Sequence, residues 1–206
     1  MKKTFLLIVA CVFAFVGAQA QNSEVESTTQ MTKVEQFKKN NSFIKETTIY
    51  DCKNGGMKIF AKLFTDLNSG EQLTALEIWP TIGSKLLAGG VVAPLGYLDM
   101  DRVDDLLLAL ETILNEANNV QAKDTCMINY TAPGGIDVIY TSEIASSVFG
   151  TVGTVIFRKK WYYVDEYGQP TVNYSEASTS CPIKSLPKLI EVIKEAQMIA
   201  KQAVEK

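Results

Sequence analysis

The chain has 206 residues, a formal net charge of −3, four cysteines and no histidine. Without histidine it cannot build a Ser-His-Asp or Cys-His catalytic site, and it lacks the commonest zinc ligand and the usual neutral-pH general base. Its mildly acidic balance argues against nucleic acid as a partner, because nucleic-acid binding needs a basic face.

Residues 1–20 have the three parts of a secretory signal peptide. Lys2 and Lys3 give a positively charged start, an apolar core follows, and residues 18–20 form an A-x-A cleavage site. We reject a lipoprotein signal at Cys11, because the chain stays apolar beyond that cysteine. Removing 20 residues, which include two lysines and no acids, leaves 186 residues with a charge of −5. The sequence therefore predicts an exported protein, periplasmic or secreted, and no later stretch is long enough to be a transmembrane segment.

Residues 21–41 are polar and poor in aromatic side chains, which predicts a flexible N-terminal segment. Val34, Phe37 and Met31 give this segment a short apolar face that can dock on the domain. The remaining residues, 42–206, are enough for one domain with a substantial core.

The first half of this domain, residues 42–120, begins with strand signals. Asn54-Gly55 separates two strand-like runs and is a strong hairpin signal. Glycines interrupt the last apolar segment, which predicts a bent strand. The four predicted strands are residues 43–51, 57–65, 73–79 and 82–98.

The clearest helix in the chain lies within residues 96–119. Seven apolar residues recur there at i, i+3, i+4, i+7 spacing and form one stripe. Asp99 or Asp101 is predicted to cap the N-terminus of this helix. A calcium loop is the alternative, but the glycine and glutamate that an EF-hand loop needs are out of register. The acids in question are Asp99, Asp101, Asp104 and Asp105.

The second half, residues 121–206, repeats the pattern. A Pro-Gly-Gly turn follows its first strand, and a turn at residues 167–170 leads into a Ser/Thr-rich passage. The final helix is predicted over Leu186–Val204, with Ser185 as its N-cap. The predicted strands are residues 125–130, 136–142, 152–158 and 161–164, of which the last two can also form one long bent strand.

The two halves align with each other. Gly55-Gly56-Met57 matches Gly134-Gly135-Ile136, and the apolar stripes of the two helices match in the same order. The predicted fold is therefore α+β, with two β-β-β-β-α repeats that form a curved antiparallel sheet with two long helices packed on it. We expect each helix to pack on the sheet of its own half.

This element order resembles the Whirly and PC4-like single-strand-binding folds. It also resembles tandem secreted inhibitor folds of the β-lactamase-inhibitor-protein type. The resemblance rests on element order alone and carries no specific motif, so it transfers no functional residue.

The chain contains no Walker loop, G-x-G-x-x-G or G-x-S-x-G motif, and we expect neither a cofactor nor a metal. Two carboxylate pairs, Asp165 with Glu166 and Asp137 with Glu143, are candidates for glycoside hydrolysis. Because nothing in the sequence fixes either pair at a catalytic separation, a non-enzymatic protein is the favoured interpretation.

The mature chain keeps three cysteines, Cys52, Cys126 and Cys181. An odd number allows one intramolecular disulfide at most. A Cys126–Cys181 bond and three reduced, buried thiols are both open alternatives.

Aromatic residues gather in the predicted hairpin at residues 161–174. Dense aromatic side chains are typical of surfaces that bind proteins or sugars. The predicted function is an exported non-enzymatic binding or interaction protein with an unknown protein or carbohydrate partner. The alternatives are an inhibitor or accessory protein of an exported enzyme, and a small carboxylate-dependent hydrolase; open sheet edges also permit a homo-oligomer. The predicted binding residues are Trp161, Tyr162, Tyr163, Tyr167 and Tyr174.

Overall fold

The computed structural model of the protein describes residues 31–81, 94–119, 125–132, 134–144, 151–164 and 170–205. The predicted signal peptide, the predicted strand residues 82–93, and Tyr167 lie outside these residues.

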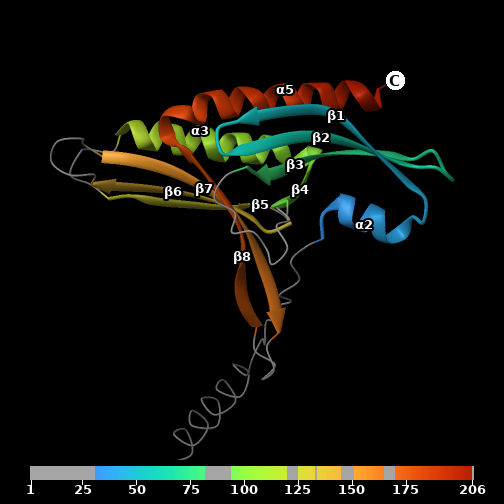
Figure 1. Cartoon of the computed structure of the whole chain (residues 1–206), viewed down its shortest axis with the longest axis horizontal. Helices are drawn as coiled ribbons and strands as arrows, with labels where there is room; N and C mark the ends of the chain where they lie inside the picture. Colours follow the sequence, from blue (N-terminus) through green and yellow to red (C-terminus); the bar gives the residue numbers. More distant parts are fainter. Residues whose placement is uncertain are drawn as a thin grey trace, which may run out of the picture.

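The described residues form two four-stranded antiparallel sheets, each followed by a long helix (Figure 1). Both sheets have their strands in sequence order. This arrangement confirms the predicted α+β fold with two β-β-β-β-α units. The first unit comprises β1 (Ile44–Asn54), β2 (Met57–Asp66), β3 (Gln72–Pro80), β4 (Gly96–Asp99), the short 3-10 helix η1 (Met100–Arg102) and α3 (Val103–Asn119). The second comprises β5 (Met127–Ala132), β6 (Ile136–Ile144), β7 (Thr151–Val164), β8 (Pro170–Pro182), η2 (Ile183–Ser185) and α5 (Leu186–Val204).

Glycines turn the chain at the first hairpin of each unit. Gly55 has φ +60°, and Gly134 and Gly135 have φ +86° and +80°. Residues with a Cβ rarely adopt this region, which explains why Gly55 aligns with Gly134, whereas Gly56, which aligns with Gly135, has no positive φ.

The fourth strand of the second sheet differs from the prediction. Residues 161–164 are not a separate strand, because β7 runs unbroken to Val164; the alternative of one long bent strand is confirmed. The pairing of β7 with β8 shifts register between Arg158 and Lys160, as at a β-bulge. The fourth strand is β8, which lies in the Ser/Thr-rich passage, where we predicted no strand.

Both long helices begin differently from the prediction. Each enters through a 3-10 turn, and neither Asp99 nor Ser185 makes a side-chain capping bond to the turn or helix that follows it. The C-terminal helix otherwise has the predicted bounds, Leu186–Val204.

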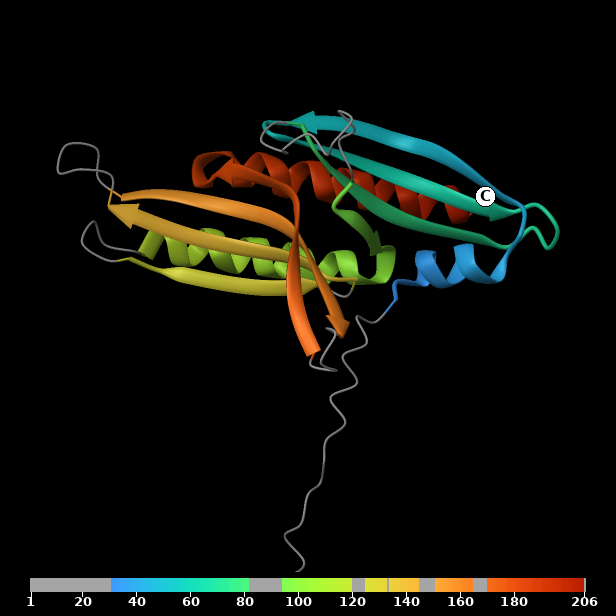
Figure 2. The same ribbon diagram turned by 60° about the horizontal axis from the view of Figure 1, so that its bottom comes forward.

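The two long helices are exchanged between the sheets. Helix α5 lies against β1, β2 and β3 of the first sheet, whereas α3 lies against β5 of the second (Figure 2). The expectation that each helix packs on its own half is therefore wrong. Helices α3 and α5 run antiparallel side by side, since Gln197 bonds Asp104 at 2.9 Å and Lys194 bonds Glu111 at 2.7 Å.

One apolar core serves both units. It contains buried residues from both sheets and both long helices, among them Ile59, Leu110, Val138 and Ile193. Burial of this much apolar surface is the dominant favourable term in folding, so the exchanged helices bind the two halves into one folded body.

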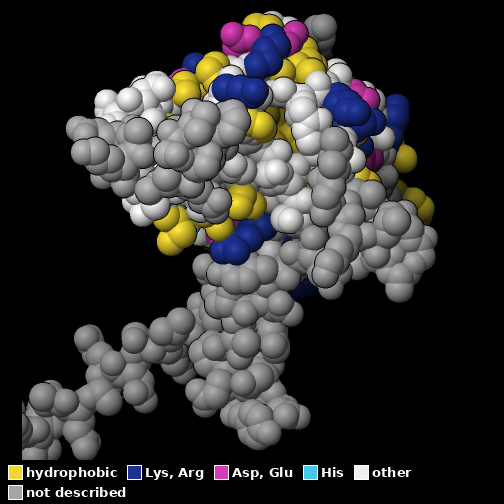
Figure 3. All heavy atoms as spheres, turned by 60° about the vertical axis from the view of Figure 1, so that its left-hand side comes forward, with side chains coloured by type: hydrophobic (Ala, Val, Ile, Leu, Met, Phe, Trp, Pro, Cys, Tyr) yellow, Lys and Arg dark blue, Asp and Glu magenta, His cyan; other side chains and the backbone are white. Residues whose placement is uncertain are grey.

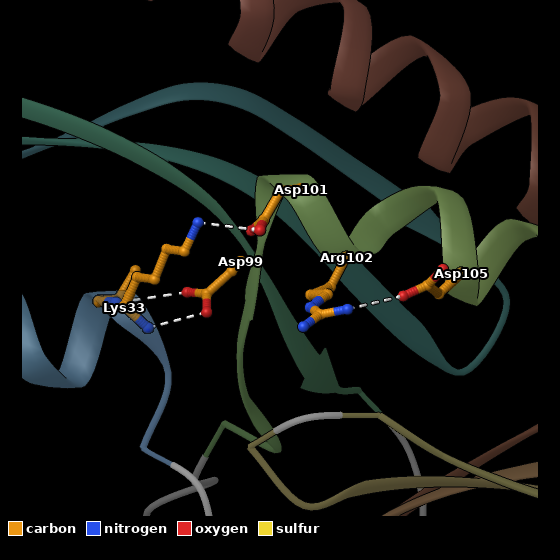
Figure 4. Close-up of polar contacts among 6 residues, drawn as sticks. Lys33, Asp99, Asp101, Arg102 and Asp105 are labelled. Atoms are coloured by element: carbon orange, nitrogen blue, oxygen red, sulfur yellow. Dashed lines mark hydrogen bonds and ion pairs between the residues drawn. The ribbon is translucent and has the colours of Figure 1, made fainter.

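Helix α2 (Lys33–Asn40) docks on the opposite face of the first sheet through Val34 and Phe37, as the apolar pattern indicated. Its N-terminus carries a capping box between Thr32 and Glu35. The Asp99 carboxylate completes the cap by accepting from the backbone amides of Lys33 at 2.8 Å and Val34 at 3.3 Å (Figure 4). Asp99 is therefore a helix cap, but for α2, whose first residue lies 66 positions before it, and not for α3.

Candidate functional site

An open groove runs between α3 and β5. Its volume is about 490 Å³, and most of its lining is apolar. Leu108 of α3 lines it with 65% of its surface exposed, the largest exposed fraction among the described hydrophobic side chains of α3. The lining residues are Asp105, Leu108, Ala109, Thr112 and Ile113 from α3, and Ile128, Asn129, Tyr130 and Thr131 from β5. We call this feature the α3–β5 groove.

Side-chain alternation on β5 produces one wall of the groove. Ile128 and Tyr130 are half-buried and pack against the core, whereas Met127, Asn129 and Thr131 are exposed. Because successive side chains in a strand point to opposite faces, the strand presents an apolar face to α3 and a polar face to solvent.

Among the strands that the structure describes, β5 is the outermost of its sheet and pairs only with β6, so its other edge carries backbone groups with no partner strand among them. The Ser142 amide donates to the Cys126 carbonyl at 2.9 Å, so this opposed pair is of the hydrogen-bonded type. Hydrogen-bonded pairs alternate along an antiparallel ladder, which places the amides and carbonyls of Met127, Asn129 and Thr131 on the open side.

The other sheet edges are protected. β4 is four residues long, and β1 carries several charged side chains and a register shift between Thr48 and Tyr50. β8 is held by the first hairpin, where the Thr179 hydroxyl donates to the Gly56 carbonyl at 2.7 Å. Short length, charge, bulges and coverage are the usual devices that stop an edge strand from pairing. β5 (MINYTA) has no charge and no proline, so it is the edge best suited to accept another strand.

The helix wall of the groove is acidic. Helix α3 contains four acidic residues and no lysine or arginine. Asp105, at one end of the groove, lies 3.4 Å from Arg102 in an exposed ion pair (Figure 4), which screens its charge only weakly. Burial, aided by the negative charge of Asp105, raises the pKa of Tyr130 above its usual value. An incoming cation is therefore favoured over an anion at this end.

Figure 3 shows one end of the molecule, where lysine and arginine side chains lie among hydrophobic and acidic side chains.

The predicted aromatic residues lie in the β7–β8 hairpin. Trp161, Tyr162 and Tyr163 belong to β7, and the register pairs Trp161 with Asn173 and Lys160 with Tyr174. This part of the hairpin extends away from the second sheet (Figures 1 and 2). The structure thus places Trp161, Tyr162, Tyr163 and Tyr174 in one arm, and their role in binding stays a prediction.

Cys52, Cys126 and Cys181 are free thiols in the structure. Cys126 precedes β5 and Cys181 lies in β8, so the two stand at opposite edges of the second sheet with β6 and β7 between them. Three strand spacings amount to about 14 Å, well beyond the roughly 7 Å limit for Cα atoms of a disulfide. The geometry therefore favours the alternative of reduced thiols.

Of the four carboxylates proposed for hydrolysis, the structure describes only the side chain of Asp137. Asp137 is buried and is engaged by the Thr131 hydroxyl at 2.6 Å and by Arg158 at 3.6 Å. Asp165 and Glu166 lie outside the described residues. Within the described part of the chain, no three His, Cys, Asp or Glu side chains are grouped as metal ligands.

None of the helices that the structure describes combines the length and the apolar character needed to cross a bilayer. Comparisons of the chain with protein-family models, with curated proteins and with solved structures give no match.

Sequence reasoning did not find the α3–β5 groove. The absence of charge and proline from MINYTA was the available signal. Which strand would be an open edge, and which helix would lie beside it, required the structure.

Proposed function

We propose that the protein is a non-enzymatic interaction protein that captures an extended segment of a partner polypeptide as an additional strand on β5. The observation that carries the proposal is an uncharged strand at the edge of the described sheet, directly beside an open apolar groove. Strand addition obtains affinity from main-chain hydrogen bonds and specificity from pockets for alternate side chains.

The added segment is expected to alternate in character. Side chains on its inner face would enter the groove between Leu108 and Ile128, so they should be apolar. A lysine or arginine is expected near Asp105, because α3 has no basic residue of its own. The same acidity disfavours a second copy of this chain, since joining two β5 edges would bring two acidic helices together.

Under this proposal, an exported enzyme that is inhibited through a captured strand is one candidate partner. Export itself rests on the signal-peptide pattern of residues 1–20.

The test is selection from a phage-displayed library of random peptides with the mature chain, residues 21–206. Selected peptides should alternate apolar residues with others and carry a basic residue. Binding should protect the Met127, Asn129 and Thr131 amides from hydrogen exchange.

Leu108→Ser should weaken binding about tenfold or more, since it removes a large apolar contact. Leu67→Ser is the matched control, because Leu67 is similarly exposed, at 62%, in the β2–β3 turn. Equal loss in both variants, or protection of amides elsewhere only, would reject the proposal.

A further inference from the structure

A second cavity lies on the face of the first sheet opposite α5. Its volume is about 470 Å³. On this face of β2, lysine and phenylalanine alternate from Lys58 to Phe64. We call Lys53, Lys58, Phe60, Lys62 and Trp79, which line the cavity, the lysine–aromatic cluster.

Helix α2 covers one end of the same face. There Phe37 and Phe64 belong to one buried cluster. The Lys38 ammonium lies 4.7 Å from the Phe64 ring centroid and 4.4 Å from that of Tyr97, and it donates to the Tyr97 hydroxyl at 2.9 Å. At this end the protein itself supplies the apolar cover and the polar contacts that the aromatic side chains need.

The other end of this face has the same combination of lysine and aromatic side chains, but they are less well covered by the protein. Trp79 packs edge-on against Phe60, with ring centroids 6.4 Å apart. Lys58 and Lys62 approach the Phe60 ring at 5.7 and 5.3 Å. Lys58, Phe60, Lys62 and Trp79 all remain partly exposed beside the cavity.

Lys62 is already neutralised. Its ammonium lies 3.0 Å from Glu46 and 3.5 Å from the buried Glu77. Burial alone would lower the pKa of Lys62, but the hydrogen bond to Glu46 and the charge of Glu77 outweigh burial and raise it. The two carboxylates therefore hold the Lys62 side chain in place at the edge of the cavity.

Lys53 and Lys58 differ from Lys62 in their charged neighbours. They stand directly opposite each other on β1 and β2, and Trp79 continues the same row on β3. Within the described residues neither lysine has an ion pair, although Asp51 lies one row away on the same face. Like charges directly opposite in a sheet are destabilising, so this row is better explained by an anion that binds between them.

Trp79 adds an unused donor. Its indole Nε1–H is buried and meets no acceptor in the part of the chain that the structure describes. Buried donors without partners are rare in folded proteins. A ligand oxygen beside the Trp79 ring would satisfy this group.

We infer that the lysine–aromatic cluster binds an acidic carbohydrate, with a sugar ring against Trp79 and Phe60 and its carboxylate or sulfate between Lys53 and Lys58. An aromatic face offers the apolar platform that the C–H face of a pyranose requires. Ammonium groups supply charge-assisted hydrogen bonds to the anion. The cavity is within the usual size range of small-ligand sites.

The test is isothermal titration of the mature chain, residues 21–206, with three disaccharides. They are digalacturonate, a chondroitin sulfate disaccharide and neutral galactobiose. At least one acidic disaccharide should bind, with an affinity that falls as salt rises, and galactobiose should bind at least tenfold more weakly. Which of the two acidic disaccharides binds distinguishes a carboxylate from a sulfate.

Lys58→Met should weaken acidic-disaccharide binding about tenfold or more, because it removes one partner of the anion. Trp79→Phe should weaken it while leaving the salt dependence unchanged. Lys45→Met is the matched control, since Lys45 is an exposed lysine on β1 whose side chain lies on the opposite face. The inference would be overturned if neither acidic disaccharide bound, or if galactobiose bound equally well. It would also be overturned if inorganic sulfate bound as tightly as the disaccharide, or if Lys58→Met left the affinity unchanged.

Discussion

Proline substitutions on β5 test the orientation of its backbone. Proline removes an amide donor, so its effect depends on whether that amide is in the ladder. Ile128 is in a hydrogen-bonded pair with Tyr140, whereas the Asn129 amide faces the open side. We therefore expect Ile128→Pro to be strongly destabilising and Asn129→Pro to be tolerated.

The expected loss for Ile128→Pro has two parts. Leaving the Tyr140 carbonyl unpaired costs about 2 kcal/mol. Losing the half-buried isoleucine side chain costs about 1 kcal/mol more. The free energy of unfolding should thus fall by about 3 kcal/mol, against about 1 kcal/mol or less for Asn129→Pro.

Urea denaturation followed by circular dichroism measures both variants. Asn129→Pro should also abolish capture of selected peptides, because it removes an outward donor from the open edge without unfolding the sheet. Equal destabilisation by the two prolines, or the reverse order, would refute the assignment of the open edge. Normal peptide capture by Asn129→Pro would refute strand addition itself.

Three further predictions concern other parts of the molecule. Asp99→Ala should lower the free energy of unfolding by about 1–2 kcal/mol, because it uncaps α2. Asp101→Asn should lower it by under about 0.5 kcal/mol, since it breaks only an exposed ion pair. A similar loss in both variants would contradict the capping role of Asp99. Burial raises the pKa of the Cys181 thiol, so Cys181 should react with iodoacetamide at pH 8 more slowly than Cys52 and Cys126. Mass spectrometry should count three alkylated cysteines, and a count below three would indicate a disulfide. If the aromatic arm binds a partner, Trp161→Ala and Tyr163→Ala should reduce partner recovery in pull-downs while the circular dichroism spectrum stays unchanged; full recovery would remove that hypothesis.

Local signals predicted much of the fold. The C-terminal helix has the predicted bounds because its apolar stripe is regular and a proline stands in its first turn. The first hairpin formed where Asn54-Gly55 indicated, since Gly55 adopts the positive φ that such a turn needs. By contrast, β8 was missed because its Ser/Thr-rich composition is typical of loops, and it is stabilised as a strand by pairing with β7.

Long-range partners could not be predicted from local patterns. A 3.6-residue stripe says which face of α3 is buried, but not that the face meets the second sheet. Likewise, a short acid before a helix is a good cap, but nothing near Asp99 in the sequence indicates that its carboxylate binds the amides of α2. The α3–β5 groove depends on the same long-range arrangement, so it became visible only with the packing of α3 beside an edge strand.

The exchange of helices also determines when the protein can fold. Helix α5, which covers β1, β2 and β3, follows the whole second sheet in the chain. During synthesis the first sheet is therefore made long before its cover, and its apolar face stays open to water until α5 emerges. Contacts between such distant segments slow folding, and exposed sheet surface favours aggregation. The two units cannot fold one after the other, because the 19-residue helix α5 of the second unit covers the sheet that was made first.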